Sequence, residues 1–414
     1  MPIKSLNSKH SKQPQYFNHT KQIDAQKANM QKAGTQKSNT QNNQTTHSPK
    51  NPKSTPKNQT HAKSTPKSRV YVLSLCILAG YIFCGVVAMI LGDSDEIWGV
   101  GRLCASIFDI GVGIDFGSFF ATSETQNASI FDSSLLTSDS RILWEVRLPR
   151  ILMAILVGAL LASSGAVTQS IFANPIADPY IIGIASAATF GAVLAHFIGL
   201  DDVYYGVVGF VCCAGFSLLI FALQKRANIT MLLIIGIAIS SFLGALSSLF
   251  MYIIGESSFK IVTWLMGYLG LSAWYKVGIL SVVLVGTLGY FYAHRNGLNI
   301  ILSGDEEAKN LGVDAPKLKR NLLIASSVAV SFGVAFCGLI GFVGLIIPHI
   351  IRLGLKDYNN ALVLPLCTAL GGLFLLFCDS IARSVQSFEI PIGIITAFFG
   401  APVFLYLALK SRRF

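Results

Sequence analysis

Three consecutive carboxylates give this chain its most distinctive charged feature. Asp305, Glu306 and Glu307 open a short segment that lies between two long apolar stretches. Each charge costs several kcal/mol in hydrocarbon, so the segment must lie on an aqueous face of a membrane. Because it is short and joined to a span at each end, it is held rigidly. We therefore predict a surface through which a soluble partner pushes on the membrane-embedded part of the chain.

Three arginines near the ends of apolar stretches are candidates for binding carboxylates. Arg147 and Arg150 open one stretch, and Arg383 ends another on the same predicted face. Guanidinium groups pair with carboxylates through two parallel hydrogen bonds, which suits capture of an acidic partner. Equally, these side chains can extend to the lipid headgroups, and Arg383 can pair with Asp379 four residues earlier. The spacing alone leaves both interpretations open.

The segment Asn174-Pro175-Ile176-Ala177-Asp178-Pro179 interrupts another apolar run. Two prolines four residues apart do not fit within a continuous helix, so the chain must turn here. The turn is the simpler interpretation. A constriction in a translocation path is the alternative, because irregular backbone at membrane depth normally lines a cavity.

Several other kinds of chemistry find no support in the sequence. No G-x-x-x-x-G-K-[ST] loop is present, so the chain lacks the usual cradle for ATP phosphates. His349 follows Pro348 without a second ligand at metal-binding spacing, and the eight cysteines show no zinc or disulfide pattern. Charged residues within the apolar stretches are scarce, which argues against an ion relay. We therefore expect no catalytic residue, no metal and no cofactor bound by this chain.

The elements that must position these residues are membrane spans. The hydrophobic fraction is 52% and the mean hydropathy is +0.57, both too high for an ordinary soluble domain. Apolar stretches of about 17 to 25 residues, the length of a spanning helix, recur along the chain. We predict an all-α membrane protein of about ten spans, near residues 71–91, 149–168, 180–199, 203–223, 230–254, 276–293, 321–339, 341–354, 361–383 and 391–409.

The distribution of charge predicts the orientation of the spans. Basic residues precede the first predicted span and follow the fourth, sixth, eighth and tenth, which places them on one side. By the positive-inside rule that side is cytoplasmic. Both termini are then cytoplasmic, and the acidic stretch at residues 92–143 is external.

The N-terminal region has a different composition from the rest. Residues 1–67 are rich in Lys, Gln, Asn and Ser, and they hold twelve Lys and one acid, Asp24, so the net charge of +11 lies in this region (12 − 1 = +11). We expect a disordered cytoplasmic tail that contacts solvent or anionic lipid, because it has almost nothing to bury. The remaining chain is near neutral, and the basic total does not argue for nucleic acid.

Taken together, five motifs resemble the FecCD or BtuC-like permease subunits of ABC importers. In order they are R-L-P-R at 147–150, S-G-A-V-x-Q-x-x-F-x-N-P-x-A-D-P at 164–179, E-E-A-x-x-L-G at 306–312, G-F-V-G-L-I-I-P-H-I-x-R at 341–352 and E-I-P-I-G-x-x-T-A-x-x-G-A-P-V-F at 389–404. The resemblance covers about residues 144 to 409. The tail and the external stretch are not part of it.

The resemblance implies a homodimer of ten-span subunits in the inner membrane. Two cytoplasmic ATPase subunits would bind ATP and Mg, and one periplasmic or surface-bound protein would deliver the substrate. It also implies roles for single residues. Arg147, Arg150 and Arg383 would dock the binding protein. The segment 303–320 would couple to the ATPase through Asp305, Glu306, Glu307, Ala308, Leu311 and Gly312. The cytoplasmic gate would include Asn174, Pro175 and Thr230.

The substrate expected from the resemblance is an iron–siderophore complex, ferric citrate, a related metal chelate, haem or cobalamin. Two other functions remain as alternatives. An ion-coupled secondary carrier needs carboxylates within the membrane, which are scarce here. A membrane anchor or receptor for a cytosolic partner needs no central cavity.

Overall fold

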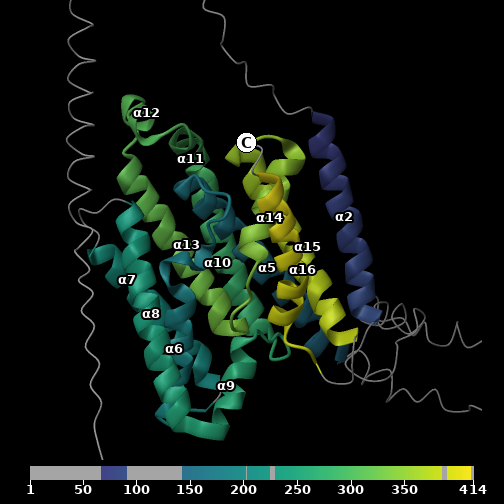
Figure 1. The fold of residues 1–414 in the computed structure, drawn as a ribbon. Coiled ribbons are helices and arrows are strands. Elements are labelled where there is room, and N and C mark those ends of the chain that lie inside the picture. The colour runs from purple at the N-terminus through teal and green to yellow at the C-terminus, as the bar shows by residue number, and fades with distance from the viewer. Residues whose placement is uncertain (1–66, 91–141, 202, 224–228, 385–388, 412–414) are drawn as a thin grey trace, which may run out of the picture. The chain divides into compact units, whose positions relative to one another are not determined.

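The computed structural model describes residues 67–90, 142–201, 203–223, 229–384 and 389–411. These residues belong to one compact unit, residues 63–414. The predicted tail at 1–67 and the predicted external stretch at 92–143 fall almost entirely outside the described residues. Within the described residues the regular structure is helical (Figure 1).

The described helices follow one another along the chain with short connections. The longer ones are α2 (Lys67–Ile90), α5 (Leu148–Phe172), α6 (Ile184–Phe197), α7 (Val203–Leu223), α8 (Ile229–Ile254), α10 (Trp274–Ala293), α13 (Ala315–Cys337), α14 (Val343–Leu355), α15 (Asn360–Ser384) and α16 (Ile392–Ser411). The short ones are η2 (Leu143–Arg147), η3 (Pro179–Ile182), η4 (Gly255–Ser257), α9 (Ser258–Leu265), α11 (Arg295–Leu302) and α12 (Asp305–Asn310).

The apolar helices match the predicted spans one for one. Six are long and apolar enough to cross a membrane, namely Lys67–Met89, Leu143–Phe172, Leu233–Leu265, Trp274–Ala293, Ala315–Cys337 and Asn360–Ser384. Four shorter apolar helices correspond to the other expected spans, at Ile184–Phe197, Tyr204–Ile220, Val343–Leu355 and Ile392–Tyr406. The prediction of an all-α membrane protein with about ten spans is confirmed.

Helix α5 is the central element of the bundle. In its most apolar window 83% of the residues are buried, against 17% for the corresponding windows of α2 and α10. It packs against α15, α14, α13 and α10. Because α5 begins at the arginine motif and ends at the Asn174-Pro175 turn, it connects two of the predicted sites directly.

Glycines allow α5 to approach its neighbours without intervening side chains. A Cβ atom added to Gly165 would lie 1.9 Å from the carbonyl oxygen of Gly344 in α14. A Cβ atom on Gly158 would lie 2.3 Å from the carbonyl oxygen of Gly371 in α15. Close approach of this kind is how helices gain van der Waals contact in lipid, where burial of apolar surface gives little driving force.

We expect Gly165→Ala to destabilise the protein, because the new methyl group meets backbone that cannot move aside. Overpacking typically costs about 1–3 kcal/mol. Thermal unfolding of the purified protein measures the effect. Gly286→Ala is the matched control, since a Cβ atom there meets nothing within 4 Å. Equal midpoints for the two variants would contradict the packing argument.

Three irregular segments satisfy one another's backbone groups where helices end inside the bundle. The Tyr268 amide donates to the Cys337 carbonyl at 2.9 Å, and the amides of Ile392 and Gly393 donate to Gly267 and Met266 at 3.1 and 2.9 Å. Polar backbone at membrane depth needs such partners. These bonds therefore anchor the start of α16 to the ends of α9 and α13.

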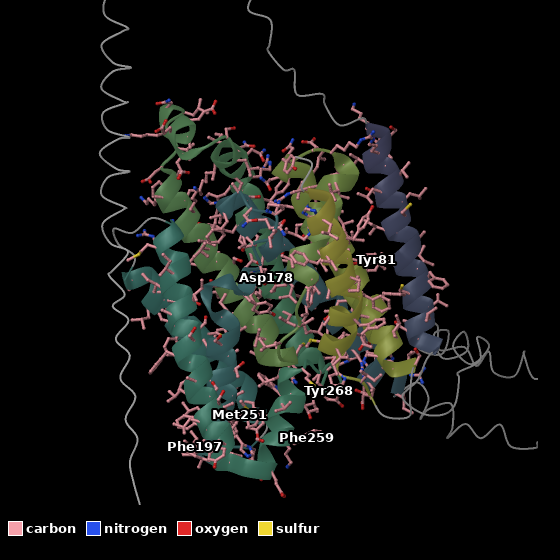
Figure 2. The ribbon with its side chains drawn as sticks, in the orientation of Figure 1. Tyr81, Asp178, Phe197, Met251, Phe259 and Tyr268 are labelled. Carbon is pink, nitrogen blue, oxygen red and sulfur yellow. The ribbon has the colours of Figure 1, made fainter. Side chains whose placement is uncertain are left out.

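A second, smaller apolar cluster joins α6, α7, α8 and α9 at the end of the bundle away from α12. Figure 2 shows Phe197, Met251 and Phe259 at this end. The rings of Phe197 and Phe250 stack with centroids 4.6 Å apart. The cluster holds the α8–α9 corner against α6.

Candidate functional site

The acidic segment forms a short helix between two glycine turns. Gly304 has φ +121° and Gly312 has φ +79°, values in the left-handed region that glycine adopts without steric cost. Between them lies α12, with its three carboxylates in the first turn, where they complement the helix dipole. The Asp314 side chain then caps α13 by accepting from the Lys317 amide at 3.1 Å.

A small core fixes α12 to its neighbours. Ala308 is completely buried and packs with Ile301 of α11 and Ala315 of α13. Asp305 pairs with Lys319 of α13, whose side chain is 9% exposed. The expected coupling residues therefore divide into two sets. Asp305, Ala308 and Gly312 set the position of the helix, whereas Glu306, Glu307 and Leu311 face outward, with Leu311 63% exposed.

Behind α12, a chain of side-chain hydrogen bonds runs from α11 into the bundle. Asn299 of α11 accepts from the backbone amide and the side-chain amide of Asn360, at 2.8 and 2.9 Å. Asn360 is fully buried at the start of α15, and its Oδ1 accepts from the Ser170 hydroxyl at 3.0 Å. The network thus links the helix next to α12 with the last turn of α5.

Arg352 of α14 is the charged member of this network. Its guanidinium donates to Gln169 Oε1, to the Ala166 carbonyl and to Ser170 Oγ, each at 2.9 Å. Arg352 is 6% exposed. It belongs to the last turn of α14 and contacts the C-terminal end of α5, so the negative ends of two helix dipoles favour a cation here. The geometry explains how a buried cation is stabilised here by neutral acceptors.

The sequence motifs do not predict this network. Gln169 and Arg352 belong to two of the family motifs without an implied role, and no motif includes a role for Ser170 or Asn360. Polar side chains inside apolar stretches were the available signal, because buried polar groups need hydrogen-bond partners. Their pairing across four helices was not accessible from spacing.

The Asn174-Pro175 motif forms a turn directly after α5. Ala173 adopts a left-handed conformation at φ 46°, and Asn174 Oδ1 accepts from the Ile176 amide at 2.9 Å. Asn174 and Pro175 are exposed, and the Ile176 side chain is 50% exposed. The predicted turn is confirmed. Thr230, the other residue expected at the gate, is in the first turn of α8.

Asp178 ends this turn and caps the short helix η3. Its Oδ1 accepts from the Tyr180 amide at 2.8 Å. Burial raises the pKa of Asp178 to about 6, and the hydrogen bond from Tyr180 opposes part of that rise. The carboxylate therefore contributes to the structure of the turn, and its charge is sensitive to mild acidification.

Two of the three outer arginines, Arg150 and Arg383, meet in a buried ion network. Arg150 Nε lies 3.1 Å from Asp379 Oδ1, and Arg383 Nε lies 3.2 Å from Asp379 Oδ2. Arg150 Nη1 also lies 2.7 Å from Glu389 Oε1. Asp379 is completely buried, and Arg150 and Arg383 are 4% and 5% exposed. One carboxylate is therefore shared by two guanidinium groups from α5 and α15.

Arg147 and Arg383 anchor the C-terminal end of α2. Arg147 donates to the Met89 carbonyl, and Arg383 donates to the Ala88 carbonyl at 3.3 Å. Helix C-terminal carbonyls lack intrahelical partners and are stabilised by cations. The expectation of outward-facing cations thus requires correction, since all three side chains are buried within this chain. The predicted pair between Arg383 and Asp379 is present.

A comparison with protein families shows to which family this chain belongs. Residues 104–410 match the model of the FecCD transport family. The chain belongs to this family. Its match spans all but one of the ten apolar helices described above, α2 being the exception.

Two relatives illustrate the range of the FecCD permeases. The cobalamin import system permease protein BtuC of Halobacterium salinarum is 42% identical over 280 residues, which is 66% of this chain and 74% of the relative. The molybdate import system permease protein MolB of Haemophilus influenzae is 39% identical over 280 residues, 66% of this chain and 82% of the relative. Both are permease subunits of import systems.

A solved structure shows the same fold. It is an ABC transporter assigned to the metal-chelate type, in an inward-facing conformation, with a TM-score of 0.66 and 32% sequence identity. The match covers 83% of this chain and all of that chain. This FecCD protein is therefore a membrane-embedded ABC importer permease, a transport component.

Proposed function

We propose that this permease imports a metal chelate as a homodimer driven by two separate ATPase subunits. The chelate class comprises iron–siderophore complexes, ferric citrate, haem and cobalamin. A substrate-binding protein outside the inner membrane delivers the chelate. Both termini of the permease are cytoplasmic, and the chain itself hydrolyses no ATP. ATP and Mg are bound by the partner ATPase.

The observation that best supports this proposal is the rigid acidic helix α12. It presents Glu306, Glu307 and Leu311 to solvent while Ala308 and the Asp305–Lys319 pair hold it to the bundle. A flexible loop would absorb a displacement imposed by a soluble partner. A packed helix transmits the displacement to α11 and α13, and through Asn299 and Asn360 to the end of α5.

The proposed homodimer is supported by apolar faces that a single chain leaves uncovered. Side chains along α8 and α16 include Ile234, Ile237 and Phe242 at 57–65% exposure, and Phe398 and Tyr406 at 71% and 61%. Lipid covers such faces in part. A second copy against α8 and α16 would enclose a central path lined by the fifth and tenth spans, with Asn174, Pro175 and Thr230 as its cytoplasmic gate.

Docking of the binding protein is proposed for the outer face that includes Arg147, Arg150 and Arg383. Within the chain these arginines neutralise Asp379 and the end of α2. Glu389, whose side chain is 24% exposed, is the part of this network nearest to solvent. An acidic partner would thus meet a network that already contains carboxylates, and its glutamates would compete with Glu389 for Arg150.

The metal-chelate class is proposed from the family and from the metal-chelate structural neighbour. The relative named for molybdate import makes an oxyanion the competing substrate. Ligand identification on the cognate binding protein separates the two. A bound chelate or corrinoid supports the proposal, and a bare oxyanion overturns it.

An ion-coupled carrier gains no support from the described carboxylates within the bundle. Asp379 is buried, but two arginines neutralise it. Both carboxylate oxygens of Asp379 are thus taken up by ion pairs within the chain. Uptake into proteoliposomes should therefore follow ATP hydrolysis by the added ATPase, and uptake that follows a proton gradient without ATP would contradict the proposal.

We expect reversal of the two outward glutamates of α12 to uncouple the permease. Glu306→Lys together with Glu307→Lys should lower substrate uptake at least tenfold, because the change reverses the charge of the surface that α12 presents to the ATPase. The fold should persist, since neither side chain supports the core. Glu256→Lys on η4 is the matched control, as it changes an exposed glutamate away from α12. Co-purification with the ATPase measures the loss directly.

A further inference from the structure

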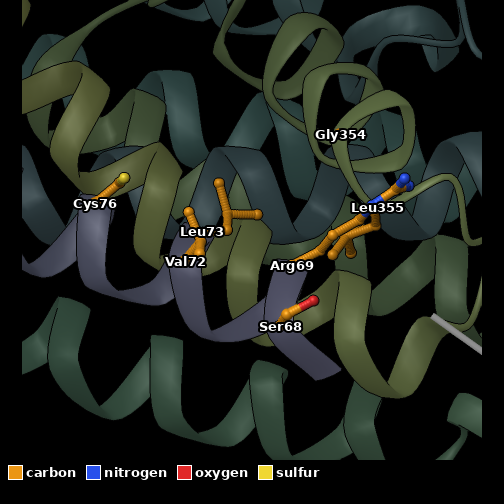
Figure 3. Close-up of a pocket in the computed structure, with 7 residues that line it drawn as sticks. All are labelled: Ser68, Arg69, Val72, Leu73, Cys76, Gly354 and Leu355. Carbon is orange, nitrogen blue, oxygen red and sulfur yellow. The ribbon is translucent and has the colours of Figure 1, made fainter. Parts of the chain in front are cut away.

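A groove separates the first turns of α2 from the end of α14. Its volume is about 390 Å³. Figure 3 shows the residues that line it, which are Ser68, Arg69, Val72, Leu73 and Cys76 of α2, and Gly354 and Leu355 of α14. The groove opens at the outer surface of the helix bundle. None of the predicted docking, coupling or gate residues belongs to it.

The groove is polar at one end and apolar along the rest of its length. Ser68, Val72 and Cys76 follow one another at intervals of four residues, so they share one face of α2. At a rise of 1.5 Å per residue this face extends about 12 Å from Ser68 to Cys76. The hydroxyl and the guanidinium lie at the start of the helix, and the apolar side chains lie deeper.

The polar end carries more positive than negative charge. Arg69 is exposed and has no hydrogen-bond or ion-pair partner among the described residues. Lys67 precedes it, and Lys356 follows Leu355 in the opposite wall; both are exposed. Asp357 is the nearby acid in sequence, and its Oδ1 already accepts from the Asn359 amide at 3.0 Å.

We propose that this groove binds an anionic phospholipid. The phosphate lies against Arg69, flanked by Lys67 and Lys356, and one acyl chain lies along Val72, Leu73 and Cys76. Charge complementarity and membrane exposure favour this occupant, because basic sites between spans attract anionic headgroups. The lipid fills the space where α2 diverges from α14. The proposal rests on the membrane location of the chain and not on the transported substrate.

Native mass spectrometry of the full-length permease tests the proposal. Protein released from nanodiscs of mixed phosphatidylglycerol and phosphatidylcholine should retain phosphatidylglycerol. Arg69→Gln should lower the retained amount at least threefold. Arg295→Gln is the matched control, because Arg295 is partly exposed outside the groove and its guanidinium is held over the Tyr292 ring, 4.3 Å from the centroid. Equal retention by the wild type and Arg69→Gln overturns the proposal.

Labelling of Cys76 provides a second measurement that does not depend on retention in the gas phase. Cys76 is exposed in the chain. In a Cys104→Ser, Cys212→Ser background, an apolar maleimide should label Cys76 at least threefold more slowly in phosphatidylglycerol than in phosphatidylcholine. Arg69→Gln should remove this difference. Equal labelling rates in both lipids would overturn the proposal and indicate an empty groove. Protection that disappears when residues 2–66 are deleted would also overturn it and indicate that the N-terminal region occupies the groove.

Discussion

Asp379→Ala should be among the most damaging single substitutions in this permease. The carboxylate is completely buried and lies 3.1 Å from Arg150 and 3.2 Å from Arg383. Its removal leaves two buried guanidinium groups facing each other without the charge between them. Breaking a buried ion pair at one partner costs about 3–5 kcal/mol. We expect a large fall in the thermal midpoint and little folded protein in the membrane.

A double substitution distinguishes loss of charge balance from loss of packing. Asp379→Ala combined with Arg383→Met removes one carboxylate and one of its cations, so it should recover part of the lost stability. Glu389→Gln should have a smaller effect than Asp379→Ala, because its side chain is 24% exposed and pairs with one arginine. If the losses of stability in Asp379→Ala and Arg383→Met simply add in the double variant, Arg383 and Asp379 are not coupled.

Arg352→Met should weaken the polar contact between the end of α5 and α14. Three acceptors at 2.9 Å would lose their donor, and the methionine cannot replace it. The Ala166 carbonyl keeps the Ser170 hydroxyl as a donor, but Gln169 Oε1 does not gain a replacement, and a buried acceptor left unsatisfied costs about 1–3 kcal/mol. Stability and uptake should therefore both fall. Arg352→Lys should retain part of each, since an ammonium keeps the charge but not the planar fork.

Two further variants make this prediction sharper. Asn299→Ala removes the link between α11 and α15 while Arg352 keeps its own partners, so uptake should fall more than the thermal midpoint. Arg295→Met changes a partly exposed arginine of α11 outside the network and should alter the free energy of unfolding by less than about 1 kcal/mol. If Arg352→Met matched Arg295→Met in both measurements, the network would have no mechanical or stabilising importance.

The sequence predicted the spans well, because length and hydrophobicity decide whether a helix crosses a membrane. Even the short helix at Val343–Leu355 was anticipated, since Pro348 and the neighbouring glycines do not change its apolar character. The acidic helix was predicted for the same reason: Glu306 and Glu307 have no place in lipid. Each of these predictions depends on local composition.

The environment of the arginines was not predictable in the same way. Arg150 and Asp379 are 229 residues apart, and only the packing of α5 against α15 brings them together. The sequence showed that Arg150 lies near a span end but not that another helix covers it. Arg352 and Asn360 were missed for a related reason, because their partners lie on α5 and α11.

The backbone contacts of α5 determine which parts of this permease can move relative to one another. Helices separated by long side chains can slide slightly, because changes of rotamer absorb the displacement. At Gly165 against Gly344 and at Gly158 against Gly371 no side chain intervenes, so α5, α14 and α15 must move as one body. Gly206 against Ala335 joins α7 to α13 in the same manner. Helix α8 has no such backbone contact at Gly244, where an added Cβ would meet nothing within 4 Å. A displacement that reaches α5 during a transport cycle should therefore move α5, α14 and α15 together, and α8 should shift relative to this body.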